Sequence, residues 1–198
     1  AGYAVAPGVA SISGTTSAVN NRVVGRVNTS GVIDTSTLFT TAFSATNIRS
    51  ATSSDGTSFW ASGGNGGVEY IQLGQSTATQ LNTAPTNIRF LHVLNGQLHG
   101  TSGSGTYVNV FTIGAGLPTT AGQIATPLPG MPITSGPSPY SFVLLDHNAA
   151  VVGIDTLYVA DYRAVASGGG IQRWTFNGTA WVLGSTFTQG ANGFRGLA

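Results

Sequence analysis

The chain has 198 residues and a formal net charge of +1, and only 7% of its residues are charged, against about 25% in ordinary soluble domains. Its hydrophobic fraction of 41% is enough for a sizeable core, which excludes the profile of a disordered chain. Its scattered arginines give no basic stripe for nucleic acid, no apolar run suggests membrane insertion, and the absence of cysteine excludes disulfides, thiolate metal sites and cysteine nucleophiles.

The first predicted unit, residues 1–46, contains three β-rich segments instead of the four found in later units. The segments are AGYAVAPG from Ala1, NRVVGRVN from Asn21 and VIDTSTLF from Val32. The opening residues lack the basic start and long apolar core of a signal peptide. They are typical of the middle of a domain, so we expect a mature, trimmed or excised chain.

The following units repeat a common pattern. NIRSATSSDGTSFWASGGNGGVEYIQLG begins at Asn47, and NIRFLHVLNGQLHGTSGSGTYVNVFTIG begins at Asn87. Each contains a strand, an Asp-Gly or Asn-Gly turn, a second strand, a Gly/Ser turn and a third strand, and a fourth strand follows. A third copy begins near Ser138, and the closing NGFRGLA has the pattern of a first strand alone. Four strands per unit are typical of β-propeller blades.

The sequence therefore predicts an all-β fold, a single β-propeller region with about fifteen short strands and almost no helix. The expected blades are 1–46, 47–86, 87–137 and 138–191, with an extra inner strand at 192–198. In the third copy, LYVAD from Leu157 followed by GGIQRWTF resembles the YVTN and NHL classes of propeller repeat. The whole chain also resembles propeller regions of large secreted bacterial proteins, some of which carry nuclease or lamin-tail modules elsewhere. The resemblance implies the fold and an extracellular location, and it carries no catalytic residue.

Turn residues predict the pairing within hairpins. The pairs are Asp55-Gly56, Asn95-Gly96 and Asn177-Gly178. Such pairs favour two-residue type I′ turns, in which both central residues have positive φ. The second turn would place His92 opposite His99, and the third would place Trp174 opposite Trp181.

The paired histidines are candidate metal ligands. Cross-strand imidazoles lie close enough to share a divalent ion, but a catalytic zinc site normally has a third protein ligand. His147 lies one blade away. We expect no metal and no cofactor, with His92 and His99 as the residues to examine for one and a structural histidine pair as the alternative.

Three arginines occupy equivalent places in the predicted inner strands. They are Arg49, Arg89 and Arg195, and Tyr140 takes the place in the third copy. Inner strands line the channel of a propeller, so these four residues are the predicted ligand-binding set, for a small anion or a carboxylated glycan. The alternative is that each guanidinium bonds carbonyls of the neighbouring blade and holds the blades together.

Catalytic signals are sparse. The six acids are Asp34, Asp55, Glu69, Asp146, Asp155 and Asp161. A glycosidase needs two facing carboxylates, and only Asp146 and Asp155 are candidates for such a pair. No GxSxG or HExxH motif occurs. No catalytic residue is assigned, and the sequence favours a protein that is not an enzyme. Trp174 and Trp181 could form a sugar-stacking platform or pack between blades.

The leading hypothesis is a non-catalytic extracellular propeller, a binding or scaffolding module of a larger secreted protein. One alternative is a polysaccharide hydrolase or lyase with its site at the channel mouth. Another is a self-assembling matrix or filament protein, because low charge and open strand edges permit self-association.

The two ends of the chain predict two arrangements. In the first, Phe194–Leu197 pairs with Tyr3–Val5 and completes a closed four-bladed ring. In the second, the chain is a part of a larger ring or is completed by a partner. We favour the second, because rings of four blades are at the small end of the usual range.

Overall fold

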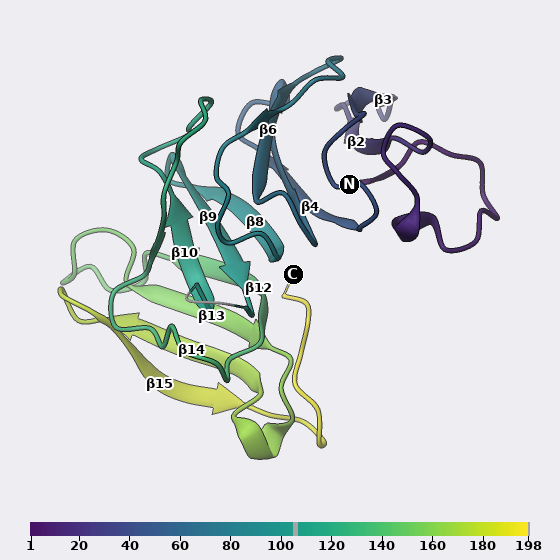
Figure 1. Ribbon diagram of the computed structural model, residues 1–198. Coiled ribbons are helices and arrows are strands. Elements are labelled where there is room, and N and C mark those ends of the chain that lie inside the picture. The colour runs from purple at the N-terminus through teal and green to yellow at the C-terminus, as the bar shows by residue number, and fades with distance from the viewer. Residues whose placement is uncertain (105–106, 198) are drawn as a thin grey trace.

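The computed structural model describes residues 1–104 and 107–197, and in them the chain is almost entirely β-structure (Figure 1). These residues form fifteen strands in four antiparallel sheets and two short 3-10 turns, Ile12–Gly14 and Val165–Ser167. The all-β prediction is confirmed. No helix in this part of the chain is long and apolar enough to cross a membrane.

Each sheet is a meander of consecutive strands. The first has three strands, β1 (Gly2–Tyr3), β2 (Arg22–Val27) and β3 (Ile33–Phe39). The second contains β4 (Ile48–Ser53), β5 (Ser58–Gly63), β6 (Val68–Gln72) and β7 (Thr79–Gln80). The third contains β8 (Ile88–Leu94), β9 (Gln97–Ser102), β10 (Asn109–Ile113) and β11 (Ala125–Pro127). The fourth contains β12 (Pro139–Leu145), β13 (Thr156–Asp161), β14 (Gly170–Phe176) and β15 (Trp181–Phe187).

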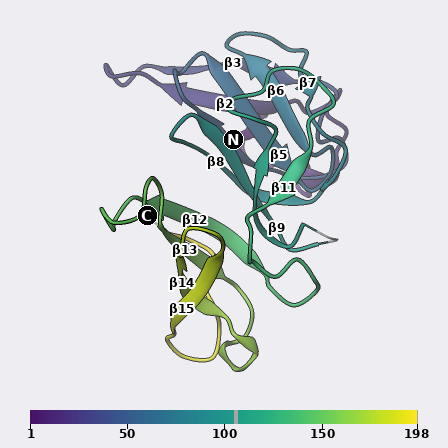
Figure 2. The same ribbon diagram turned by 90° about the vertical axis from the view of Figure 1, so that its left-hand side faces the viewer.

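Neighbouring sheets pack through three separate hydrophobic cores. Alternate residues of β5 point to opposite faces, as the pleat of a strand requires. Phe59 and Ala61 lie in the core shared with the first sheet, and Trp60 lies in the core shared with the third. In the same way, Phe111 of β10 faces the second sheet and Val110 faces the fourth. The second and third sheets therefore have both faces buried, and Figure 2 shows the sheets following one another through the molecule.

The first strands of successive sheets lie side by side. The hydroxyl of Ser50 in β4 accepts a hydrogen bond from the backbone N–H of Leu91 in β8, at 3.0 Å. Thr101 of β9 donates to the carbonyl of Tyr140 in β12, at 2.7 Å. The series continues beyond β12, because the Leu197 N–H donates to the hydroxyl of Ser141, at 2.7 Å.

The closing segment differs from its prediction. In the described residues it is an irregular segment with an isolated bridge between Ala164 and Asn192, not a regular strand. Its backbone bonds reach Asp161, Ser141 and Val165. Within the described chain no hydrogen bond joins residues 3–6 to residues 194–197, so the two ends do not close a four-bladed ring. Tyr3 instead pairs with Arg22 of β2.

One of the three predicted turns is confirmed. Asn95 and Gly96 have φ values of 46° and 71°, and His92 lies opposite His99. Both central residues are in the left-handed region, as a type I′ turn requires.

The other two turns are wider than predicted. The Asp55 carboxylate accepts hydrogen bonds from the N–H groups of Thr57 and Ser58, both at 2.7 Å, and Ser53 pairs with Phe59. The side chain of Asn177 likewise accepts from Thr179 and Ala180. A side chain that binds the backbone two or three residues on favours a longer loop. As a result Trp174 lies opposite Leu183, and Trp181 lies opposite Phe176.

Candidate functional site

Two of the three predicted arginine positions, Arg49 and Arg89, coincide with β-bulges at the start of the first strands. Ile48 pairs with Gly63 and Ser50 pairs with Ser62, which leaves Arg49 as an extra residue. The same shift occurs one sheet along, where Arg89 is the extra residue between Ile88 and Phe90. A bulge redirects the side chain of the inserted residue away from the regular alternation of the strand. The structure therefore presents both arginines in the same way.

Each of these two arginines reaches the next sheet. The Arg49 Nη1 donates to the side-chain oxygen of Asn87. The Arg89 Nη1 donates to the hydroxyl of Ser138 at 2.7 Å and to the Pro139 carbonyl at 3.2 Å. Asn87 and Ser138 occupy equivalent places, directly before the first strand of a sheet. Inter-sheet contact, the alternative stated for these residues, is thus part of their role.

A glycine leaves room for the Arg89 guanidinium. A Cβ atom at Gly103 would lie 2.6 Å from the Arg89 Nη2. Gly64 is its equivalent in the second sheet, where a Cβ atom would clash with the Thr46 Oγ1 and would lie at an ordinary contact distance of 3.6 Å from the Arg49 Nη2. In the fourth sheet Tyr162 follows β13 at the corresponding place, and Tyr140 takes the place of the arginine.

Aromatic rings continue the series. The Arg89 guanidinium carbon lies 4.5 Å from the centre of the Tyr140 ring. The Arg195 guanidinium lies 3.8 Å from the Tyr162 ring centre and 5.3 Å from that of Tyr140, and the two rings contact edge to face. These are cation–π distances. We call the set Arg49, Arg89, Tyr140, Tyr162 and Arg195 the arginine–tyrosine row.

The row carries excess positive charge. Burial lowers the pKa of Arg89 most, and the neighbouring charges of Arg49 and Arg195 lower it further, whereas Tyr140 and Asp161 oppose the shift. Asp161 already forms an ion pair with Arg163 at 2.9 Å and accepts the N–H of Ser138. The nearby carboxylate is therefore engaged by a different arginine.

Several donors of the row have no protein acceptor. In the described residues Arg49 and Arg89 each donate through Nη1 alone, and no side-chain hydrogen bond is formed by Arg195. A guanidinium has five N–H donors in a planar fork. Arg22 provides the contrast, because it is fully buried and donates to the carbonyls of Ser13, Thr15, Asn20 and Thr46. Arg22 is the chain's structural arginine, and sequence reasoning missed it because it lies outside the repeat.

The histidine pair lies in an aromatic cluster. The His92 and His99 rings lie 6.1 and 6.3 Å from Phe142 of the next sheet. Burial is the main reason that the pKa of His99 is lowered to about 4. The charge of His92 lowers this pKa further, whereas the hydrogen bond with the Gln97 carbonyl raises it. No group of three metal-ligating side chains occurs within residues 1–104 and 107–197. Both rings pack against Phe142, and the Nδ1 of His92 is buried with no hydrogen-bond partner among the described residues.

The remaining candidates also have structural partners. The Asp155 carboxylate accepts from the N–H groups of His147 and Asn148 and from the Thr156 hydroxyl, so it orders a loop instead of facing a second acid. Trp174 and Trp181 are buried in the core between the third and fourth sheets. Neither ring is presented as a platform.

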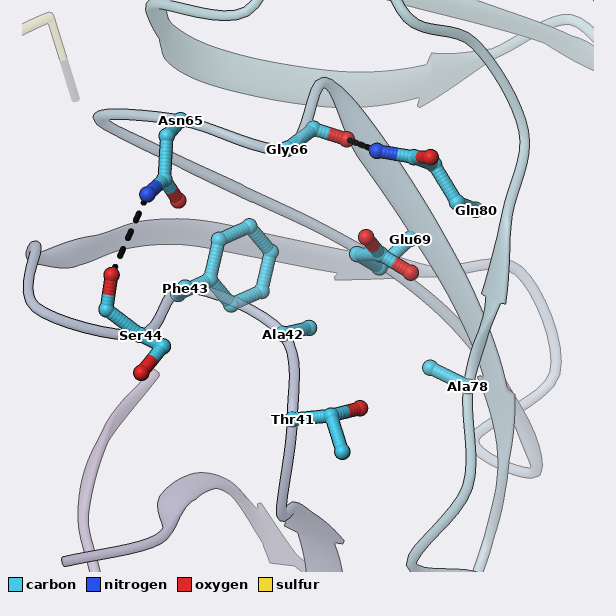
Figure 3. Close-up of a pocket in the computed structure, with 9 residues that line it drawn as sticks. All are labelled: Thr41, Ala42, Phe43, Ser44, Asn65, Gly66, Glu69, Ala78 and Gln80. Atoms are coloured by element: carbon cyan, nitrogen blue, oxygen red, sulfur yellow. Dashed lines mark hydrogen bonds between the residues drawn. The ribbon is translucent and has the colours of Figure 1, made fainter. Parts of the chain in front are cut away.

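A second site was not predicted. Glu69 lies on β6 and is buried, and its carboxylate points into a cavity between the first and second sheets (Figure 3). The sequence offered no signal for it beyond an acid within the strand segment VEYIQ, where strands rarely place a charge.

No family model matches the sequence, and no curated protein is similar enough in sequence to match. A solved structure described as the extracellular domain of a one-component system from B. thetaiotaomicron is similar in fold, with a TM-score of 0.50 and 17% sequence identity. The similarity covers 86% of this chain, and the chain spans 22% of the length of that structure.

Proposed function

We propose that the chain is a non-catalytic extracellular binding module, part of a larger secreted protein, whose sheets are propeller blades and whose ligand is a carboxylate-bearing glycan or small anion. Three observations support the blade assignment. The sheets are meanders, they pack face to face, and the first strands of the second, third and fourth sheets are adjacent. The similarity in fold to an extracellular domain supports the extracellular location.

The arginine–tyrosine row carries the proposal. Three guanidinium groups lie at equivalent places, and they retain donors that the described protein does not use. A carboxylate fits the fork of an arginine through two parallel hydrogen bonds. The tyrosine rings hold the Arg195 guanidinium in position, so less conformational entropy is lost when a ligand binds.

Calorimetric titration with oligogalacturonate and with its neutral methyl ester tests this proposal. We expect the acidic oligosaccharide to bind and the ester to bind at least tenfold more weakly. Arg195→Gln should weaken binding about tenfold, since it removes a charge that makes no hydrogen bond within the described fold. The matched control is Arg26→Gln, which removes the same charge outside the row. Equal weakening by both variants would reject the row as the site.

Self-assembly is a second candidate function, which β15 favours. Among the residues that the structure describes, this edge strand pairs only with β14, and it exposes three large apolar side chains, Val182, Leu183 and Phe187. An exposed apolar edge is a template for pairing with another chain. Light scattering over a concentration series tests it, and a constant monomer mass would reject it.

A further inference from the structure

The cavity beside Glu69 has a composition opposite to that of the arginine–tyrosine row. Its volume is about 430 Å³, and it lies between the segment 41–44, which follows β3, and strands β6 and β7 (Figure 3). Glu69 is the charged residue among those that line it, and no arginine is among them. The cavity therefore has negative potential when Glu69 is ionised.

The Glu69 carboxylate has no partner within the described residues. Its side chain is only 5% exposed, and none of the hydrogen bonds or ion pairs formed by these residues involves it. Its cross-strand neighbours, Ala61 and Gln80, do not titrate, and neither does Phe43 beside it. Burial alone raises the pKa of Glu69 to about 7. An isolated buried carboxylate costs free energy unless something supplies charge or donors to it.

Two amide oxygens add acceptors to the cavity. The Asn65 Nδ2 donates to the Ser44 carbonyl at 3.1 Å, and the Gln80 Nε2 donates to the Gly66 carbonyl at 2.7 Å (Figure 3). These bonds fix the orientation of both amides, because only the nitrogen atoms can donate. The Oδ1 of Asn65 and the Oε1 of Gln80 receive no hydrogen bond from the described residues. In the described part of the chain, the wall of the cavity thus carries polar acceptors and no cation in addition to the Glu69 carboxylate.

Apolar groups form the rest of the wall. Phe43, Ala42 and Ala78 line the cavity around the carboxylate. They provide a surface for a carbon skeleton. An aromatic ring near a cation also contributes cation–π attraction.

We propose that this cavity binds a small primary ammonium compound, with the ammonium group at Glu69 and the carbon skeleton against Phe43 and Ala78. An ammonium group has three donors and no acceptor, which complements a carboxylate that has no donor within the described residues. Its charge also compensates the buried carboxylate. This site is independent of the arginine–tyrosine row, which has the opposite charge preference.

The probes are n-butylammonium and cyclohexylammonium, with n-butanol and cyclohexanol as neutral counterparts. Binding is measured at pH 8 by following protein NMR shifts during titration. We expect at least one amine to bind saturably with perturbed signals from Phe43, Asn65 and Ala78, and its neutral counterpart to bind at least tenfold more weakly. Equal binding of amine and neutral counterpart, or no saturable binding of either amine, would overturn the proposal.

Variants test whether amine binding depends on the Glu69 carboxylate itself and not on a change in the fold. Glu69→Gln keeps the shape of the side chain and should weaken amine binding at least tenfold. Asp146→Asn removes an acid outside the cavity and should leave binding unchanged. Ala78→Leu fills the cavity without changing charge and should also abolish binding. Arg195→Gln should not affect the amine, which keeps this test distinct from that of the row. Unchanged binding by Glu69→Gln would refute the assignment.

The pH dependence gives a further readout. The ammonium pairs with ionised Glu69, so affinity should be constant above the pKa of Glu69 and should fall about tenfold for each pH unit below it. Residual binding by Glu69→Gln should not vary over the same range. A flat profile for the unmodified chain would contradict a role for this carboxylate.

Discussion

Two buried charged residues, Arg22 and Glu69, show how differently this protein treats charge at the scale of single residues. Arg22 is fully buried, and four carbonyls accept hydrogen bonds from its guanidinium. Glu69 is nearly as buried and has no donor among the described residues. The first arrangement compensates a charge within the fold through Nη1 and Nη2, although Nε has no partner among the described residues, and the second leaves a charge to be satisfied by protonation or by a ligand.

Arg22→Met should destabilise the protein strongly, because it leaves buried carbonyls without a donor. We expect a loss of about 3 kcal/mol in the free energy of unfolding, measured by urea denaturation. The control is Arg26→Met, on the same strand and forming no side-chain hydrogen bond within the described residues, which should cost less than about 0.5 kcal/mol. Similar losses for both variants would show that Arg22 contributes only bulk.

Glu69 should make stability fall as the pH rises. Its pKa is about 7 in the folded chain, against a reference value of 4.5, so the folded state keeps its proton more tightly. Its favourable contribution is therefore complete below about pH 4.5, is lost between pH 4.5 and 7, and is absent above. The loss is about 3 kcal/mol.

In unfolding experiments at several pH values, Glu69→Gln should lack this component. It should be more stable than the unmodified chain at pH 8 and similar to it at pH 4. A higher stability of the unmodified chain at pH 8 would mean that the carboxylate has a partner in solution.

At the scale of elements, the same hydroxyl contact joins successive sheets. Ser50 joins β4 to β8 through the Leu91 N–H, and Ser141 joins β12 to the closing segment through the Leu197 N–H and the Arg195 carbonyl. Each serine directly follows a row position. The repetition shows that the closing segment occupies the place of a next first strand, although it is not a regular strand.

Removing the hydroxyl of Ser50 and removing that of Ser141 should affect different parts of the fold. Ser50→Ala leaves the buried Leu91 N–H unpaired and should cost about 1–2 kcal/mol of global stability. Ser141→Ala should mainly release the closing segment, which has few other backbone bonds. Hydrogen exchange should then accelerate at the Leu197 amide and not in β12. Acceleration throughout β12 would mean that the segment is integral to the fourth sheet.

The sequence predicts the strand repeat well and the bulges poorly. Alternation and turn residues recur with the repeat, so the meanders could be read directly. The turn at Asn95-Gly96 follows from residues that tolerate positive φ. The two-residue turn predicted at Asp55-Gly56 was wrong, because the Asp55 side chain accepts hydrogen bonds from two backbone N–H groups. A prediction based on the two central turn residues does not consider such side-chain bonds. The bulges at Arg49 and Arg89 follow no turn residue or break in alternation that a sequence pattern would reveal.

The candidate sites show the same division. The three arginines were recognisable because they recur at one position of a repeat. The alternative was bonding to carbonyls of the neighbouring sheet; Arg89 bonds the Pro139 carbonyl, whereas Arg49 bonds the side chain of Asn87. Tyr162 and Glu69 were not singled out, because one replaces a glycine of the repeat and the other acquires its surroundings from segments near 43 and 80.

At the scale of the whole molecule, the edge strand β15 of the fourth sheet is the candidate surface for association with another copy of the chain. If β15 mediates it, Leu183→Lys should reduce the concentration-dependent increase in scattering mass, because a lysine on an edge strand opposes pairing. Val152→Lys is the control, since Val152 is fully exposed in a loop away from the edge. If both variants associate as the unmodified chain does, β15 is not the interface.

The second and third sheets each contribute to two cores, and this affects which insertions and duplications the chain can accept during evolution. Phe59 and Trp60 are sequence neighbours that belong to different cores, so a single-residue insertion in β5 would exchange the two packing environments at once. Duplication of a complete four-strand unit meets no such obstacle, since it adds one new interface and leaves the existing ones in register. The protein is therefore far more tolerant of gaining or losing whole sheets than of small length changes within one.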